Sequence, residues 1–473
     1  MKRKIILFVS TVLFFSHLLY GCEKKADTPD PVEKLIEASQ LQTFHDSRIK
    51  DKESPYTLCF ENNDGTKSLY IFNSPIAYYN AEDALEMIDN TLIPVKDKVL
   101  RKEGYRLENK SSDVKCYFSK DPVKIPFLVK GKNREFAFYP DKEIAGTGIQ
   151  SGVFTDLTGA ARDCATYQVK NKDIRLEYIP TCAGIAVNIT ISARPENNRI
   201  SFYLEDKDGI EYETNRDMYT VFTDTKENRK TAIVYPSFLK DFAGTINFNS
   251  KIIIEPEDGR LKYTIELDEA FLKSPHTEYP LNITPKFEVY RDAIPDSTVY
   301  SQKPDLNAYL ADYAVLGYDS SWGESLHYLR FRINYIFKSY EQNVISANYV
   351  STSLSGNGTS LRAEMKRIKN MWSSTGITWN IKYHAYDTES VTELTAPGRY
   401  SFNITEFVKS AIKDDTWNTE GYGLVMAASK DSSTMKVIAT SDNALYQPYV
   451  RIDFNDLPWS FEKILTINPN TEN

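Results

Sequence analysis

Histidine and cysteine are scarce in this chain, with five of each among 473 residues. Beyond residue 22 four histidines remain: His45, His276, His327 and His384. No two of them have the spacing of metal ligands, and the cysteines lack zinc-site spacing, so neither a metal nor another cofactor is expected. Asp312, Asp319 and Glu324 carry oxygens that could bind calcium, but they lack the spacing of an EF-hand loop.

Catalytic motifs and long basic runs are missing as well. The chain has no Gly-x-Ser-x-Gly elbow and no phosphate-cradling glycine loop, and acidic pairs alone do not predict glycoside hydrolysis, which depends on spatial separation. We therefore expect no enzyme. The net charge is −8, and the most basic patch, residues 362–369, is typical of a solvated strand or loop. A nucleic-acid partner is not expected.

The longest apolar run near the start, Ile5 to Phe15, is too short to span a membrane. It follows three basic residues, which predicts a signal peptide over residues 1–21. The next segment, Leu19-Tyr20-Gly21-Cys22, resembles the lipobox of bacterial lipoproteins, in which the cysteine carries the lipid. The resemblance implies lipid attachment at Cys22 and an outer-membrane anchor facing either side. The alternative is an ordinary signal peptide that happens to contain a cysteine. Within residues 22–43, the polar, proline-containing stretch after Cys22 predicts a tether, and Asp30-Pro31 followed by an apolar stripe predicts a short helix.

Four further cysteines could form disulfides, because an exported protein meets an oxidising compartment. Cys164 and Cys182 are the favoured pair, since two strand-like runs joined by a polar turn at residues 170–173 would bring them together. Cys59 and Cys116 would then pair by elimination.

Strand signals dominate the chain from about residue 56 onward. Glycine and proline total 41 residues and tyrosine alone 31, which favours β architecture with many turns. Residues 56–72 contain two runs around Asn63-Asp64-Gly65, a hairpin signature. Later runs alternate apolar and polar residues, as half-buried antiparallel strands do. The length predicts two or three domains.

Three stretches between residues 74 and 289 resemble the front region of bacterial RHS-repeat and wall-associated proteins. They are SPIAYYNAEDALEMIDNTL (74–92), the segment from Tyr167 to Ile185, and EYPLNITPKFEV (278–289). The resemblance implies a β-rich region over residues 44–290.

The C-terminal third resembles a DNRLRE domain, a β-sandwich family related to carbohydrate-binding module family 96. The matching stretches are LADYAVLGYD, LHYLRFRINYIF, ISANYVSTSL, MWSSTGITWN, GRYSFNITEFVKSAIK and SDNALYQPYVRIDF. The chain departs from the family pattern at Ser374 and at residues 381–383. The resemblance implies an antiparallel, jelly-roll-like sandwich over residues 300–456, followed by a tail at 457–473, and glycan binding as its function.

A short helix is predicted after Asn403, which can cap it, with Glu406 three residues on as in a capping box. One apolar stripe follows at helical spacing: Ile404, Phe407, Val408, Ala411 and Ile412. In MWSSTGITWN, strand alternation places Ile377 and Trp379 on one face, so Trp379 is predicted to pack in the core. We expect the same of Trp372.

Aromatic residues in loops are the candidates for glycan binding: Tyr318, Trp322, Trp417 and Tyr422. Such a ring can offer its face to the apolar C–H groups of a sugar, but it can equally fold back onto the core. The sequence therefore predicts an all-β, exported lipoprotein that binds a glycan or cell-surface polysaccharide without cleaving it. The alternatives are a structural or adhesive surface protein without a sugar site, and a shortened relative of RHS-type toxin carriers.

Overall fold

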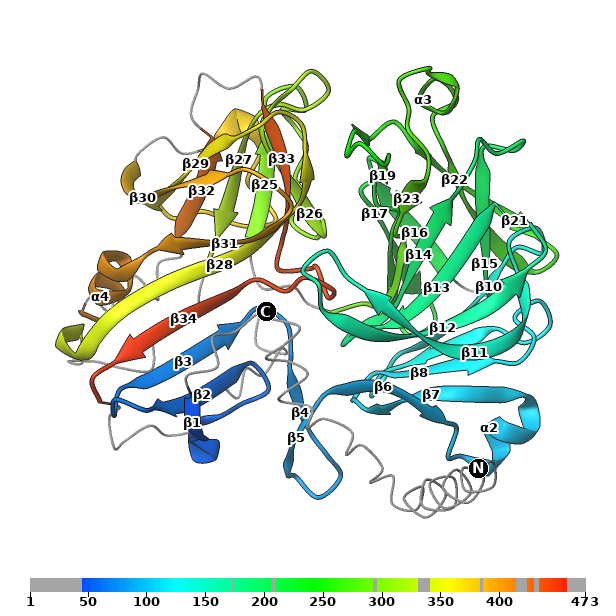
Figure 1. Cartoon of the computed structure of the whole chain (residues 1–473), viewed down its shortest axis with the longest axis horizontal. Coiled ribbons are helices and arrows are strands. Elements are labelled where there is room, and N and C mark those ends of the chain that lie inside the picture. The colour runs from blue at the N-terminus through cyan, green and yellow to red at the C-terminus, as the bar shows by residue number, and fades with distance from the viewer. Residues whose placement is uncertain are drawn as a thin grey trace, which may run out of the picture.

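The computed structural model describes residues 45–171, 173–205, 210–291, 296–330, 341–382, 386–413, 423–428 and 434–456. Over these ranges the chain is mostly β, and antiparallel sheets form two sandwiches that lie side by side (Figure 1). The predicted all-β class is confirmed. The signal peptide, Cys22 and the short helix predicted before residue 44 lie outside the described residues.

The N-terminal sandwich pairs an eight-stranded sheet with an eleven-stranded sheet. The first contains, in spatial order, β21 (Lys251–Glu257), β22 (Arg260–Glu266), β15 (Arg199–Glu205), β10 (Glu135–Pro140), β9 (Phe127–Lys130), β8 (Lys115–Ser119), β7 (Tyr105–Ser111) and β6 (Asp89–Pro94). The second contains β11 (Gly146–Thr155), β12 (Ala161–Val169), β13 (Ile174–Pro180), β14 (Gly184–Ile191), β24 (Lys286–Val289), β18 (Arg229–Tyr235), β17 (Tyr219–Asp224) and β16 (Ile210–Asn215), with β19 (Leu239–Lys240), β20 (Ile246–Asn247) and β23 (Leu281–Ile283) beside this path.

The C-terminal sandwich is one thirteen-stranded sheet whose two halves face each other. Its order is β1 (His45–Arg48), β2 (Thr57–Asn62), β3 (Lys67–Phe72), β34 (Tyr449–Phe454), β28 (Val344–Gly356), β33 (Met435–Ala439), β26 (Tyr313–Asp319), β27 (Gly323–Leu329), β32 (Leu424–Ala428), β29 (Leu361–Ile368) and β30 (Tyr386–Leu394); β25 (Asp296–Tyr300) pairs with β27, and β31 (Gly398–Asn403) with β28.

Short elements complete the described fold. They are the ribbon β4 (Ala77–Tyr79) and β5 (Leu85–Met87), the helices α2 (Lys98–Glu103), α3 (Glu269–Lys273) and α4 (Thr405–Lys413), and the 3-10 turns η1 (Lys50–Lys52), η2 (Glu341–Asn343) and η3 (Trp379–Ile381). Within the described ranges, none of the helices combines the length and the apolar character that crossing a bilayer requires.

The first strands of the chain belong to the second sandwich. The sequence placed residues 44–290 in one β-rich region, yet β3 pairs with β34 through Leu69 and Ile452, almost four hundred residues apart. Figure 1 shows the blue strands β1 to β3 beside the red β34. The C-terminal sandwich is therefore built from residues 45–72 together with residues 296–454.

Two local predictions are confirmed. Strands β2 and β3 form the predicted hairpin, and Gly65 in its turn has a φ of +84°, a backbone angle that glycine adopts readily. Helix α4 follows Asn403, whose side-chain oxygen accepts from the backbone N–H of Thr405 at 3.0 Å. All five residues of the predicted stripe are buried: Ile404, Phe407, Val408, Ala411 and Ile412.

The two sandwiches are fused through their faces, which makes four layers. Along β18, Val234 points into the core of the N-terminal sandwich and Ile233 into a separate core between the sandwiches, because neighbouring strand residues face opposite sides. Along β26, Leu316 points into the core of the C-terminal sandwich and Val315 into the same core between the sandwiches. We call the contact between the outer faces of these two sheets the seam. An interface this apolar holds the sandwiches together as one body.

Candidate functional site

A cavity of about 380 Å³ opens at one end of the seam. The N-terminal sandwich supplies the turn after β16, the segment after β18 and residues 248–251. The C-terminal sandwich supplies Lys303, Tyr313 and Trp322. Because Trp322 is part of its lining, we call it the tryptophan cavity. A second cavity of about 270 Å³ shares Ser237 and Tyr313 with it and reaches the polar side chains of the seam.

Aromatic rings form one side of the tryptophan cavity. Trp322 is only 2% exposed, and its ring centroid lies 4.6 Å from that of Tyr300 and 5.6 Å from that of Phe248. The indole Nε1 of Trp322 and the hydroxyl of Ser250, which is 8% exposed, have no hydrogen-bond partner. Buried donors usually have partners, so these two polar atoms in the lining indicate a place where a ligand could bind.

Three cations and one carboxylate also line the tryptophan cavity: Arg216, Lys251, Lys303 and Asp217. The Lys303 ammonium lies 3.5 Å from the centroid of the Trp322 ring. Burial lowers the pKa of Lys303, and the nearby Arg216 lowers it further. In the part of the chain that the structure describes, none of the three cations forms an ion pair.

The backbone around the cavity is strained. Three of the six non-glycine residues with positive φ in the described ranges line it, namely Arg216 (44°), Asp217 (60°) and Ser237 (67°). Arg216 and Asp217 are the central residues of a turn closed by Met218 N–H donating to Asn215 O at 2.9 Å. Asn and Gly are favoured where both central residues have positive φ. Aspartate is also accepted there, but arginine is not among the favoured residues, and backbone strain of this kind clusters at functional sites.

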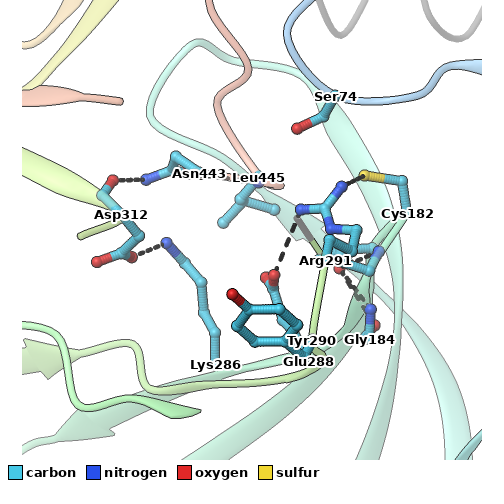
Figure 2. A network of polar contacts seen from close by, with 12 residues as sticks. Ser74, Cys182, Gly184, Lys286, Glu288, Tyr290, Arg291, Asp312, Asn443 and Leu445 are labelled. Carbon is cyan, nitrogen blue, oxygen red and sulfur yellow. Dashed lines mark hydrogen bonds and ion pairs between the residues drawn. The ribbon is translucent and has the colours of Figure 1, made fainter. Parts of the chain in front are cut away.

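The polar half of the seam contains buried charges from both sandwiches (Figure 2). Lys286 on β24 pairs with Asp312, which precedes β26. Asn443 donates to the backbone oxygen of Asp312 at 2.9 Å. Arg291 lies 3.5 Å from a carboxylate oxygen of Glu288. Of these contacts, the Lys286–Asp312 ion pair joins the two sandwiches across the seam, while the other two lie within one sandwich each.

The two predicted glycan-binding residues that the structure describes, Tyr318 and Trp322, do not form one platform. Tyr318, at the end of β26, is 47% exposed, whereas Trp322 is folded into the seam and forms a cavity wall instead of an exposed surface. Trp417 and Tyr422 lie outside the described residues. Sequence reasoning missed Arg216, which only the contact between the sandwiches brings to Trp322, and Lys303, which the pairing of β25 with β27 places beside Trp322. The Arg-Asp pair in a hairpin turn was the available signal.

Trp372 and Trp379 pack in the same small cluster behind β27, but to different depths. Trp372 is buried, with its ring 5.2 Å from that of Tyr328, while Trp379 is half-buried at the rim. Trp379 begins the turn η3 instead of continuing a strand, and Lys382 Nζ lies 3.6 Å from the centroid of its ring. Both residues are scaffold of the C-terminal sandwich.

The predicted disulfides are wrong, because Cys59, Cys116, Cys164 and Cys182 are all free and buried. Strand β12 pairs with β13 so that Ala165 lies opposite Tyr178, which places Cys164 opposite Ile179. Cys182 is three residues farther along, about 10 Å at the strand rise, so the hairpin does not bring the thiols together. Cys59 and Cys116 lie in the cores of different sandwiches.

The three potential calcium ligands do not converge. Asp312 is paired with Lys286 in the seam, while Asp319 and Glu324 flank the turn between β26 and β27. Across the described ranges, no group of three or more His, Cys, Asp or Glu side chains could hold a metal ion.

Comparison with known proteins adds little to this geometry. No protein-family model and no curated protein matches the chain. One solved structure with a weak likeness is that of an exo-β-1,3-galactanase from Phanerochaete chrysosporium with galactose. It is 8% identical, with 84% of this chain and 93% of that one covered, at a TM-score of 0.12. A likeness at that TM-score supports no inference about fold or function.

Proposed function

We propose that this protein binds a saccharide without cleaving it, in the tryptophan cavity at the seam. The observation that carries the proposal is the combination of an aromatic wall with three cations that form no ion pair among the described residues. Aromatic faces pack against the apolar C–H groups of sugar rings, and Arg and Lys donate to hydroxyl and acidic substituents. The orphaned Nε1 of Trp322 and hydroxyl of Ser250 are further hydrogen-bonding groups for such a ligand.

The carboxylate content of the cavity supports binding over hydrolysis. Glycoside hydrolases of the common kinds use two carboxyl groups that flank the scissile bond. The lining of the tryptophan cavity supplies a single carboxylate, Asp217, whose oxygen accepts from the Ile252 N–H at 3.1 Å. The cavity thus has groups to hold and orient a sugar but lacks the pair that would protonate and attack it.

The location of the protein is part of the same proposal. The lipobox-like segment ending at Cys22 supports export and acylation, which would tether both sandwiches to the outer membrane. The resemblance of residues 300–456 to DNRLRE domains supports a carbohydrate-related role for the C-terminal sandwich. Cys22→Ala should release the protein from the membrane fraction or leave it unprocessed, and full membrane retention with ordinary cleavage would contradict the anchor.

A glycan array probed with the chain from residue 23 onward tests the binding proposal directly. A saccharide that binds the wild type should bind Arg216→Gln and Lys303→Gln about tenfold or more weakly, since a hydrogen bond to a charged group contributes about 1.5–3 kcal/mol. Lys102→Gln, an exposed charge change on α2, is the matched control and should bind as the wild type does. Equal binding by all four proteins would place the sugar elsewhere, for example at Tyr318.

A structural or adhesive role is the second candidate, and the apolar seam favours it. Buried residues from both sandwiches form one continuous core between them, which makes a stiff four-layer body suited to display or spacing. If no saccharide binds the wild type or raises its melting temperature, this second function replaces the first.

A further inference from the structure

The polar half of the seam buries more acidic than basic groups. Four carboxyl groups meet there, each more than nine-tenths buried: Glu288, Asp296, Asp312 and Asp442. Glu288 belongs to the N-terminal sandwich and the other three to the C-terminal sandwich. Asp442 interacts electrostatically with the three others, so they form one cluster. The cations of this cluster are Lys286 and Arg291, two positive charges for four carboxyl groups.

The two cations are already engaged by two of the acids. Lys286 pairs with Asp312, and Arg291 lies 3.5 Å from Glu288 and donates to the sulfur of Cys182 at 3.7 Å (Figure 2). Asp296 instead accepts from Ser441, from its N–H at 2.8 Å and its hydroxyl at 2.6 Å. Asp296 and Asp442 thus form no ion pair with a lysine or arginine in the described part of the seam, and Arg291 acts on Asp442 only beyond ion-pair distance.

One oxygen of every carboxyl group in the cluster lacks a hydrogen-bond partner: Glu288 Oε1, Asp296 Oδ1, Asp312 Oδ1 and Asp442 Oδ2. A buried, unpaired carboxylate is costly, so its charge must be neutralised by a cation or a proton. A metal ion does not fit, because the described side chains contain no group of three or more His, Cys, Asp or Glu that could hold one. Protons remain.

We propose that the seam is a proton-linked junction, in which Asp442 and Asp296 hold carboxyl protons while the two sandwiches are docked. Base removes these protons and places uncompensated negative charge between the sandwiches. Docking is therefore strongest when the carboxyl groups are neutral and weakens as the pH rises. The proposal does not depend on saccharide binding, because it concerns the seam alone.

The titration behaviour of the cluster agrees with this geometry. Burial raises the pKa of Asp296 to about 7, and burial followed by the charge of Asp296 raises the pKa of Asp442 well above its ordinary value. Burial also raises the pKa of Glu288 to about 7. A carboxyl group with a raised pKa in the folded state stabilises the fold below its unfolded pKa, near 4. This contribution is lost as the pH rises from about 4 to the pKa that the group has in the folded state.

His327 faces Asp296 but does not neutralise it. Its Nε2 lies 3.9 Å from the Asp296 oxygen, while its Nδ1 shares a 2.9 Å hydrogen bond with the hydroxyl of Thr298. Burial lowers the pKa of His327 to about 3, so the ring is neutral in the folded protein and destabilises it only below about pH 6.5. Burial also raises the pKa values of the other titratable groups around the cluster, which are Asp113, Cys116, Cys182, Tyr219, Tyr235, Tyr313 and Tyr349.

Urea unfolding between about pH 6.5 and 9 tests the junction, because His327 is neutral in both states over this range. The wild type should lose stability as the pH rises, with the folding equilibrium constant falling about tenfold per pH unit for each proton held by the folded state alone. Asp442→Asn should reduce this slope wherever the folded protein still holds the Asp442 proton. Asp296→Asn should reduce it only at the lower end of the range, because the pKa of Asp296 in the folded protein is about 7. Asp258→Asn, at an exposed turn between β21 and β22, is the matched control and should keep the wild-type slope.

Parallel pH profiles in the wild type and both seam variants would overturn the proposal. If neither variant folds, small-angle X-ray scattering of the wild type decides. The radius of gyration should increase toward about pH 9 in urea below the unfolding midpoint, as the sandwiches separate. A wild type whose urea midpoint and radius of gyration both stay constant over the range would likewise contradict it.

Discussion

The two sandwiches bury their cores with different side chains, although each packs two antiparallel layers face to face. The N-terminal core contains a connected network of aromatic rings among its aliphatic residues, including Phe138 and Phe287, whose centroids lie 4.1 Å apart at an angle of 7°. The C-terminal core uses aliphatic residues, methionines such as Met365 and Met426, and the apolar face of α4. The same layered architecture thus tolerates two packing solutions, provided that volume and alternation are kept.

The difference should appear in how each core responds to substitution. A ring in a network has several ring neighbours, and Phe138 contacts Phe127, Phe202 and Phe287. Methionine is flexible and fills irregular gaps, so its replacement is easier to accommodate. The N-terminal core should therefore be the more sensitive of the two to changes of shape.

The largest expected effect is that of Phe138→Ala, which should lower the free energy of unfolding by about 3–5 kcal/mol, because a cavity replaces a ring in a packed core. Met426→Leu in the C-terminal core is the matched control and should cost less than about 1.5 kcal/mol, since it keeps the volume. Urea denaturation followed by circular dichroism measures both. Equal losses would show that the two cores do not differ in this respect.

The tryptophan pair sharpens the comparison within the C-terminal sandwich. Trp372→Ala should cost about 3 kcal/mol or more, because the ring is buried against Tyr328. Trp379→Ala should cost about half as much, since the half-buried ring removes less apolar area from water. Thermal unfolding of the two variants measures the difference. A larger loss for Trp379 would mean that the rim of this cluster supports more structure than its burial indicates.

The smallest effect concerns α4, the helix whose apolar face packs on the C-terminal core. Asn403→Ala removes the oxygen that accepts from Thr405, and should destabilise the protein by about 1 kcal/mol. Asn403→Asp keeps an acceptor at this position and should stay close to the wild type in the same urea titration. If alanine and aspartate behave alike, α4 is held by its buried face alone.

Local features were predictable because they depend on neighbouring residues. The hairpin at Asn63-Asp64-Gly65 and the helix after Asn403 follow from turn chemistry, capping and periodicity, all of which act within about ten residues. The burial of both faces of β18 was not predicted from the sequence, although its apolar run Ala232–Tyr235 fits a strand buried on both sides. What packs against each face depends on segments far away in the sequence.

By itself, the sequence determined the all-β class, the turns, the capped helix and the identity of the aromatic residues available for binding. Only the tertiary structure decided that residues 45–72 complete the C-terminal sandwich, that Cys164 and Cys182 stay apart, and that Trp322 meets Arg216 and Lys303 in one cavity. The reason is physical: turn and helix preferences are set by adjacent side chains. Strand partners and seam contacts are chosen by the burial of surfaces that lie hundreds of residues apart.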